Sequence, residues 1–328
     1  MKVTRREVSK LMLLSGVGAL LGLRPGSAAA QANGVVRIGL PTRAYWPAVP
    51  VHAAQELGFY EKEGLAAEIT IYNSGGAAME AIAAGACDII SASPATVAGA
   101  RMRGVGAKIV AAGSQTPRGF YVIVKADSPY QSMQDLAGKN LGITAAGSTT
   151  DFLALWAIEH SATPMTKVAV GGGSLIPNLL SDQLDAIVAY PPLSYTLLST
   201  GEGRAVLDYG AEMEPCMPDT WVGAEQSIRD RPATIEATLR AIFGALRHIQ
   251  NDRAWGLEFV QRYTQLSPEV AVMEYERTLL PLPTDGELQR AWIETSMRLA
   301  KLAGLTDLPP VDEMFTTAFT PLKTVTML

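Results

Sequence analysis

The chain has 328 residues, of which 27 are basic and 32 acidic, with 48% hydrophobic residues and a formal net charge of −5 at pH 7. Residues 1–32 have the order of an export signal, and without them 22 bases and 31 acids leave a net charge of about −9. A chain this acidic does not bind nucleic acid through a general basic surface, and its apolar content suffices for one large domain or two medium ones.

The first segment predicts export. A basic start with the pair Arg5 and Arg6 precedes an apolar run over residues 11–23, and small residues follow, where we expect cleavage after Ala30 or Ala32. The run is shorter than the roughly 20 residues that a membrane-spanning helix needs. The paired arginines favour the twin-arginine route; the alternative is an ordinary Sec signal. We expect the mature protein in the periplasm.

Beyond the signal, strands and helices alternate. Residues 35–40 predict a strand, and a loop over 41–46 leads into a helix over 47–57. Further strands are expected over 68–72, 108–113, 120–125, 140–144 and 167–170, with a helix over 151–160. From residue 226 onward the chain predicts helices over 231–251, 254–263, 268–279, 285–302 and 311–319. We expect this tail to pack on one lobe.

The middle of the chain repeats at an offset of 97 residues. The matched pairs are Gly75 and Gly172, Gly76 and Gly173, Asp88 and Asp185, Pro94 and Pro191, and Gly104 and Gly201. Each copy predicts a strand, a turn at glycines, a helix and a second short buried strand. Each proline suits the first turn of the next helix.

Two such copies predict two similar α/β lobes. We expect lobe 1 to comprise residues 34–122 plus 223–328, and lobe 2 residues 123–222. The lobes should meet near residues 120–124 and again near 221–224, which gives two crossover strands and a hinge. Ligands of open α/β sheets bind at the carboxyl ends of the strands, so the cleft between the lobes is the expected site.

Four segments resemble a known family. Residues 53–65 resemble its motif A-x-E-x-G-F-F-x-K-E-G-L, and residues 84–89 resemble x-x-G-x-x-D-I. Residues 127–148 resemble S-P-I…D-L-K-G-K…G-S, and residues 184–191 resemble I-D-A…P. The family is that of ABC-transporter substrate-binding proteins of the nitrate/sulfonate/taurine type, a superfamily that includes thiamine-pyrimidine-synthase-like proteins. The resemblance implies a bilobal periplasmic-binding-protein fold, type II-like, that closes on a small molecule and delivers it to an ABC permease with its ATPase.

Two glycine- and serine-rich turns are candidate anion sites. Ser74, Gly75 and Gly76 follow one strand, and Gly147, Ser148 and Thr149 follow another and open a helix. Free N–H groups at a helix start bind anions; the alternative for each serine is a capping role only.

Aromatic and basic residues complete the candidate ligand site. The repeat assigns Ser93 and Tyr190 to the cleft, one from each lobe, although Ser93 could instead cap a helix. The loop after the first strand, Arg118 and Trp221 are further candidates, with surface positions or core packing as the alternatives. The loop residues are Thr42, Arg43, Tyr45 and Trp46. Together these residues predict that the ligand is a small organic anion, either a sulfonate or a carboxylate, and aromatic acids are among the candidates. A neutral pyrimidine-like heterocycle is the alternative ligand.

Catalysis, metals and cofactors find little support in the sequence. The histidines at 52, 160 and 248 are isolated on helix patterns and lack partners at metal spacing. Cys87 and Cys216 lie far apart in sequence, and we expect two free thiols. We therefore expect a monomeric binding protein that is not an enzyme and holds no cofactor. A periplasmic enzyme or a sensor module on the same fold remains the alternative.

Overall fold

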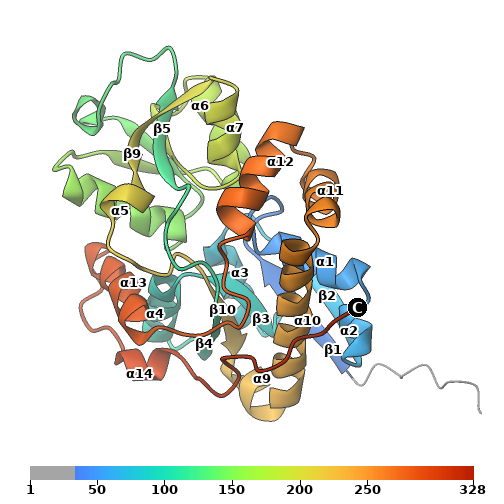
Figure 1. Ribbon diagram of the computed structural model, residues 1–328. Coiled ribbons are helices and arrows are strands. Elements are labelled where there is room, and N and C mark those ends of the chain that lie inside the picture. Colours follow the sequence, from blue (N-terminus) through green and yellow to red (C-terminus); the bar gives the residue numbers. More distant parts are fainter. Residues whose placement is uncertain (1–33) are drawn as a thin grey trace, which may run out of the picture.

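The computed structural model describes residues 34–328, which form two α/β units stacked one above the other, with a helical C-terminal region beside them (Figure 1). This confirms the predicted fold class. The predicted export signal, residues 1–32, lies outside the described residues.

The first unit contains a five-stranded sheet in the order β2-β1-β3-β10-β4. Its strands are β1 (Gly34–Leu40), β2 (Leu65–Ile71), β3 (Ile89–Ala92), β4 (Ala107–Ala112) and β10 (Thr220–Ala224). Strand β1 runs parallel to β2 and β3, whereas β10 is antiparallel to β3 and β4. β3 and β10 are buried along their whole length, as is typical of strands covered on both faces. The helices that follow these strands are α1 (Ala48–Glu56), α2 (Phe59–Lys62), α3 (Gly75–Ala83) and α4 (Pro94–Met102).

The second unit contains a five-stranded sheet in the order β7-β6-β8-β5-β9. Its strands are β5 (Tyr121–Lys125), β6 (Asn140–Ile143), β7 (Thr166–Ala169), β8 (Ala186–Ala189) and β9 (Gly203–Asp208). Its helices are α5 (Thr149–His160), α6 (Leu175–Leu180), α7 (Leu193–Ser199) and α8 (Tyr209–Glu212), with 3-10 turns at Met133–Leu136 and Gly172–Ser174. The sequence did not predict β9, because this edge strand is only half-buried and lacks a clear apolar alternation.

The chain passes from one sheet to the other in the loops between strands, not within a strand. The expected boundaries, 122/123 and 222/223, fall inside β5 and β10, but all of β5 belongs to the second sheet and all of β10 to the first. The chain therefore crosses over between β4 and β5 and again between α8 and β10. We propose these two connections as the boundaries of the lobes, and hinge motion about them stays a prediction.

The predicted repeat appears at matching places in the two sheets. Helix α4 begins at Pro94, as expected. Helix α7 instead begins at Leu193, because Pro191 is followed by Pro192, and a residue before proline is disfavoured in the helical region.

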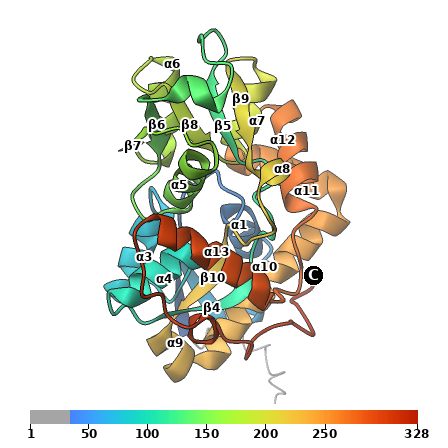
Figure 2. The same ribbon diagram turned by 90° about the vertical axis from the view of Figure 1, so that its left-hand side faces the viewer.

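The expectation that the helical tail packs on one lobe is wrong. Its elements are α9 (Glu225–Asp230), α10 (Pro232–Asn251), α11 (Arg253–Thr264), α12 (Pro268–Glu274), a π-helical turn (Tyr275–Leu279), α13 (Arg290–Leu302) and α14 (Val311–Met314). Helix α10 packs on α1, but α12 packs on α7 of the second unit. Helix α13 lies between the units, against α4 and α5 (Figure 2). There Ala300 joins Ala95 and Phe152 in one apolar cluster, so the tail connects both units.

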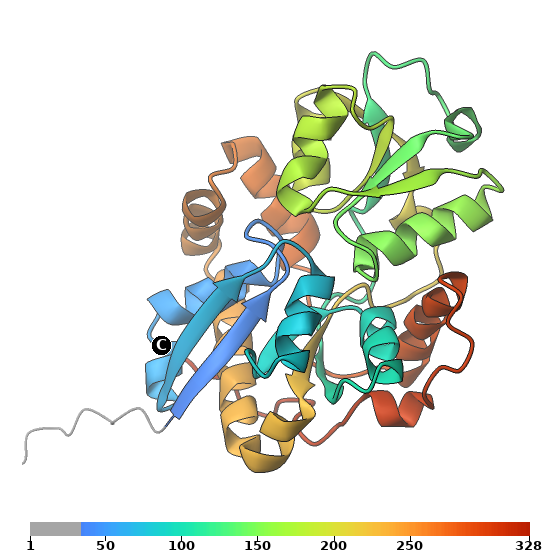
Figure 3. The same cartoon turned by 180° about the vertical axis from the view of Figure 1, so that it is seen from behind.

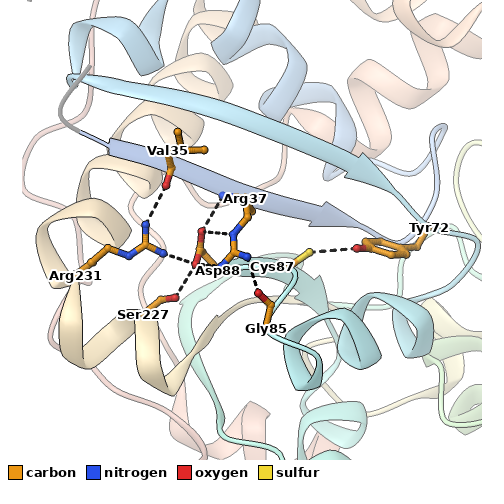
Figure 4. A network of polar contacts seen from close by, with 8 residues as sticks. All are labelled: Val35, Arg37, Tyr72, Gly85, Cys87, Asp88, Ser227 and Arg231. Atoms are coloured by element: carbon orange, nitrogen blue, oxygen red, sulfur yellow. Dashed lines mark hydrogen bonds and ion pairs between the residues drawn. The ribbon is translucent and has the colours of Figure 1, made fainter. Parts of the chain in front are cut away.

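A polar network holds the amino-terminal ends of the first sheet to the tail (Figure 4). The carboxylate of Asp88, fully buried just before β3, accepts hydrogen bonds from the Arg37 backbone N–H at 2.9 Å and from Ser227 Oγ at 2.8 Å. The guanidinium groups of Arg37 and Arg231 both pair with it. Burial raises the pKa of Asp88, but the hydrogen bonds from Arg37 and Ser227 outweigh burial, so the pKa lies below its usual range.

Candidate ligand-binding cleft

A small cavity of about 30 Å³ lies where the two units face each other. The loops after β1, β2, β6 and β8 supply most of its walls, so it sits at the carboxyl ends of these strands. Figure 3 shows the two units from the side opposite to Figure 1. The lining residues of the cavity are Pro41, Thr42, Tyr45, Ser74, Gly75, Phe120, Thr144, Ser148, Thr149, Thr150, Tyr190 and Asp219. We call this space the cleft.

Two helix starts reach the cleft, one from each unit. Ser74 caps α3, and its Oγ accepts the N–H of Ala77 at 3.1 Å. Ser148 caps α5, and its Oγ accepts the N–H of Asp151 at 3.3 Å. The first N–H groups of a helix have no partner within it. The caps take those of Ala77 and Asp151, and among the described residues those of Gly75, Gly76, Thr149 and Thr150 remain for another acceptor. Both helices also present the positive end of their dipoles to the cleft.

Hydroxyl groups of the second unit hold the start of α5 in place. Thr144 Oγ1 donates to Ser148 Oγ at 2.9 Å, and the N–H of Thr144 donates to Thr150 Oγ1 at 2.9 Å. Ser148 Oγ in turn donates to the carbonyl of Ala145 at 2.7 Å. Because these side chains are buried and already bonded to one another, they fix the turn, and the backbone N–H groups stay available.

Three aromatic rings form one wall of the cleft. The rings of Tyr45 and Tyr190 meet edge to face with centroids 5.2 Å apart, and Phe120 lies 6.1 Å from Tyr45. Burial raises the pKa of Tyr190 to about 12, so its hydroxyl stays neutral. A Cβ at Gly172 would come within 2.5 Å of Tyr190 Oη, which explains why glycine stands there. These rings offer an apolar surface to a ligand.

Asp219 supplies the one carboxyl group of the lining residues described. It is 2% exposed, and Tyr45 Oη donates a hydrogen bond to it. Burial raises the pKa of Asp219 to about 8, so this carboxyl is protonated at neutral pH. Among residues 34–328, no lysine, arginine or histidine lines the cleft. The helix starts therefore provide the positive potential there.

Half of the sequence-predicted candidates lie at the cleft. Those lining it are Thr42, Tyr45, Ser74, Gly75, Ser148, Thr149 and Tyr190, while Arg43, Trp46, Gly76, Ser93, Arg118, Gly147 and Trp221 do not line it. Whether the first group contacts a ligand stays a prediction.

The basic candidates lie elsewhere. The guanidinium of Arg43 lies 5.5 Å from the ring centroid of Tyr263 on α11, outside the cleft. Arg118 and Trp46 line a second cavity behind the aromatic wall. Trp221 is buried inside β10, edge to face with Trp46 at 6.1 Å.

Three small candidate residues that do not line the cleft make contacts of their own. Ser93 caps α4 and accepts the N–H of Thr96 at 3.2 Å, so the capping alternative describes it, and it does not face the cleft. The carbonyl of Gly147 accepts a hydrogen bond from Thr96 Oγ1 at 2.9 Å, which links the two units directly. A Cβ at Gly76 would lie 3.3 Å from the carbonyl of Ala146, so close approach of the units favours glycine there.

Five lining residues were missed by the sequence analysis: Pro41, Phe120, Thr144, Thr150 and Asp219. Thr144 and Thr150 flank the predicted turn, and their position at a strand end could have indicated them. Asp219 gave no local signal, because it lies in a crossover connection that only the assembled units bring to the cleft.

Other features bear on function. Within residues 34–328, no group of three or more histidine, cysteine, aspartate or glutamate side chains could hold a metal ion. In the same residues, no helix combines the length and apolarity needed to cross a membrane. Cys87 and Cys216 are buried free thiols, and neither lines the cleft.

Known proteins match the chain in sequence and in structure. The model of the family described as NMT1/THI5 like matches residues 48–252. A protein of Brucella abortus, described only as a binding protein, is 26% identical over 224 residues, which are 66% of this chain and 67% of the relative.

Solved structures share the fold. A protein of Bordetella bronchiseptica RB50 superposes with a TM-score of 0.77 and 21% identity, covering 89% of this chain and 96% of its own. The alkanesulfonate-binding protein SsuA of Xanthomonas axonopodis pv. citri, bound to MOPS, superposes with a TM-score of 0.69 and 19% identity, covering 84% of this chain and 95% of its own. The desulfurization enzyme DSZB superposes with a TM-score of 0.63 and 14% identity, covering 88% of this chain and 97% of its own.

Proposed function

The chain belongs to the NMT1/THI5-like family, and we propose that it is an extracytoplasmic solute-binding protein that captures a small organic anion in the cleft and delivers it to an ABC permease. The sulfonate-binding protein with the same fold and the Brucella relative described as a binding protein both support this role. The export signal expected over residues 1–32 supports a periplasmic location.

The observation that carries the proposal is the pair of helix starts. Those of α3 and α5 come from different units and face one cleft. A sulfonate or carboxylate could accept hydrogen bonds from the N–H groups of both helix starts, and the neutral Asp219 adds no opposing charge. The aromatic wall of Tyr45, Phe120 and Tyr190 suits a flat or apolar ligand body.

Asp219 favours a second candidate ligand. A protonated carboxyl both donates and accepts hydrogen bonds, and Tyr45 Oη already binds to it. A neutral pyrimidine-like heterocycle presents donors and acceptors on one edge, and it would complement this pair. Asp219→Ala, which removes both the donor and the acceptor, should then weaken a heterocycle more than a sulfonate.

The alternative of an enzyme has one argument in its favour, since DSZB has the same fold. Against it, the cleft lining among residues 34–328 contains no histidine or cysteine, and so no nucleophile activated by a neighbouring imidazole. We propose binding without turnover. Mass spectrometry of a bound ligand after long incubation should recover it unchanged.

The size of the cleft supports a closing motion. At about 30 Å³ it has room for water-sized groups only, so a ligand must enter when the units stand apart. Residues 34–112 with 220–328 would then move against residues 121–208. Small-angle scattering should detect compaction when a tight ligand saturates the protein.

A ligand panel tests the proposed function. Sulfonates, aromatic acids, nitrate and pyrimidines would be compared by thermal shift, since a ligand at about 100 times its Kd stabilises by roughly 2.7 kcal/mol. A response confined to neutral heterocycles would overturn the anion proposal.

Two variants locate the ligand. Tyr190→Ala should cost roughly 1–3 kcal/mol of affinity if its ring contacts the ligand. The repeat assigns Ser93 to the cleft, but this serine caps α4, so Ser93→Ala should cost about 1 kcal/mol of stability and leave affinity unchanged. Unchanged affinity in Tyr190→Ala would remove that ring from the site.

A further inference from the structure

A second cavity of about 160 Å³ lies behind the aromatic wall of the cleft. Tyr45 and Phe120 line both cavities, so their rings separate the two. The other walls come from residues 114–118 of the first crossover, from Pro191 of the second unit, and from the tail at residues 277–282. We call this space the rear cavity.

Two buried donors on its wall have no acceptor among the described residues. Trp46 is 3% exposed, and its Nε1 makes no hydrogen bond within residues 34–328. The hydroxyl of Ser114 is also buried and unbonded within the same residues. A buried polar group without a partner costs free energy, but both atoms are closed off from the cavity, so they would reach an acceptor there only after the side chains of the wall move.

Two arginines stand at the same cavity without acidic partners. Among residues 34–328, neither Arg118 nor Arg277 has a carboxylate within 4.0 Å, and no aspartate or glutamate lines the cavity. The one cation–π contact of Arg277 puts its guanidinium 6.0 Å from the ring centroid of Tyr195. By contrast, Arg37, Arg231 and Arg240 each pair with a carboxylate. The rear cavity thus gathers two exposed guanidinium groups and, among the described residues, no carboxylate.

We propose that the rear cavity is a second anion site, which takes a sulfate, phosphate, sulfonate or carboxylate group. The guanidinium of arginine matches the paired oxygens of such groups, and two guanidinium groups line this one cavity. The anion comes either from solution or from the far end of a ligand in the cleft; the chemistry is the same.

The position of the site gives it a conformational effect. Its walls come from a crossover connection, the second unit and the tail, and these segments must move relative to one another if the units separate. An anion held by Arg118 and Arg277 therefore favours the arrangement in which both face one cavity. The rear cavity would then raise the affinity of the cleft for its own ligand.

Calorimetry with inorganic sulfate and phosphate tests the site, with chloride at equal ionic strength as the reference. The full mature protein should bind one oxyanion, and Arg118→Gln and Arg277→Gln should each weaken it at least tenfold. Arg118→Lys should weaken it less, because charge is kept. Arg298→Gln is the matched control, since this exposed arginine lies in a groove with Glu159, Glu212 and Glu214.

The outcomes separate this proposal from the proposed function. Oxyanion binding that is lost in Tyr190→Ala but kept in Arg118→Gln belongs to the cleft and overturns the rear site. The proposal is also overturned if Arg298→Gln weakens oxyanion binding as much as Arg118→Gln does. It is overturned as well if the binding of every oxyanion and diacid tested is independent of Arg118 and Arg277. If inorganic oxyanions do not bind, but Arg118→Gln weakens a ligand with two acidic groups tenfold and leaves its monoacid analogue unchanged, the site exists and holds the ligand's far end.

Discussion

The first sheet runs β2-β1-β3-β10-β4 and the second runs β7-β6-β8-β5-β9, so every strand of one has a counterpart in the same place in the other. Asp88 and Asp185 stand just before the matching strands β3 and β8. Each accepts a backbone N–H from the neighbouring strand at 2.9 Å, that of Arg37 or of Asn140. Their other partners differ, because the tail brings Arg231 and Ser227 to Asp88, whereas Asp185 accepts a hydrogen bond from Tyr130 Oη at 2.8 Å. The repeated unit fixes the backbone contact, and the element that covers the sheet end sets the rest.

The largest expected difference between the sheets is at these two aspartates. Asp88→Asn leaves two guanidinium groups without their carboxylate and should lower the free energy of unfolding by about 3–4 kcal/mol. This is the lower part of the range for a broken buried ion pair, because both arginines are partly exposed. Asp185→Asn weakens hydrogen bonds from two neutral donors, Tyr130 Oη and the Asn140 N–H, and should cost about 1–2 kcal/mol. Urea unfolding of both variants measures the difference.

Acid titration gives an independent check on Asp88. Its pKa is lowered in the folded protein, so its contribution to stability is present above the unfolded value near 4 and is lost as the pH falls through the folded value. The difference between wild type and Asp88→Asn should therefore shrink at low pH. Equal losses for the two variants at pH 7 would contradict the comparison.

Glu274, in the tail, has no counterpart in the second unit. It is fully buried, and its oxygens have no hydrogen-bond partner among residues 34–328; burial raises its pKa to about 8. The unfolded carboxyl ionises near pH 4, so this group makes the fold progressively less stable as the pH rises from about 4 to 8. Glu274→Gln should be more stable than wild type by about 2–3 kcal/mol at pH 8, and no more stable at pH 4. Asp219 acts in the same direction, so the readout is the pH dependence of the difference between the two proteins in thermal unfolding.

Matching glycines test how closely the sheets are packed. Gly39 in β1 and Gly142 in β6 pair with Ile90 and Ile187, which are 97 residues apart. A Cβ at Gly39 would lie 2.9 Å from Cys87 Sγ, and one at Gly142 would lie 2.4 Å from Leu184 Cδ1. Alanine at either position should cost about 1–3 kcal/mol through overpacking.

The same strand offers the control. A Cβ at Gly34, also in β1, would have no atom of the described residues within 4 Å, so Gly34→Ala should change stability by less than about 0.5 kcal/mol. Chemical denaturation of the three variants decides the matter. A tolerated Gly142→Ala beside a disruptive Gly39→Ala would mean that the second sheet is packed more loosely.

The smallest effect concerns a turn. Gly85 has φ of 68°, and its match at the offset of 97, Asp182, has φ of 59°. Because no atom of the described chain lies within 4 Å of a Cβ at Gly85, Gly85→Ala isolates the conformational cost, about 1 kcal/mol. Gly85→Asn should cost about half as much, since asparagine tolerates this region as aspartate does. Melting temperatures in that order are expected; equal temperatures would contradict a shared turn geometry.

The sequence predicted the parts of the fold that local patterns encode. The repeat located β3 and β8, and glycine- and serine-rich turns indicated the starts of α3 and α5. The half-buried edge strand β9 escaped, because its residues do not alternate. The tail was predicted as helices, but its contacts with both units depend on the assembled structure.

The candidate site was predictable only where a strand end carries the residue. Tyr190 follows β8 directly and Ser148 lies in the short turn after β6, so topology takes both to the cleft. Arg43 and Arg118 belong to loops whose side-chain direction no periodicity fixes, and both point away from it. Asp219 reaches the cleft through the return crossover, which the pattern of a single segment does not reveal.

The interleaving of β10 has a consequence for the order in which the chain assembles. The second sheet is built from one continuous stretch, residues 121–208, and can form as soon as that stretch is available. The first sheet keeps a gap between β3 and β4 until residues 220–224 arrive, more than a hundred positions after β4. Long-range pairing of this kind slows folding, so the second sheet would mature first and the first would remain open at its centre. A nascent chain ending before residue 220 would present two unpaired strand edges, which are natural targets for chaperones.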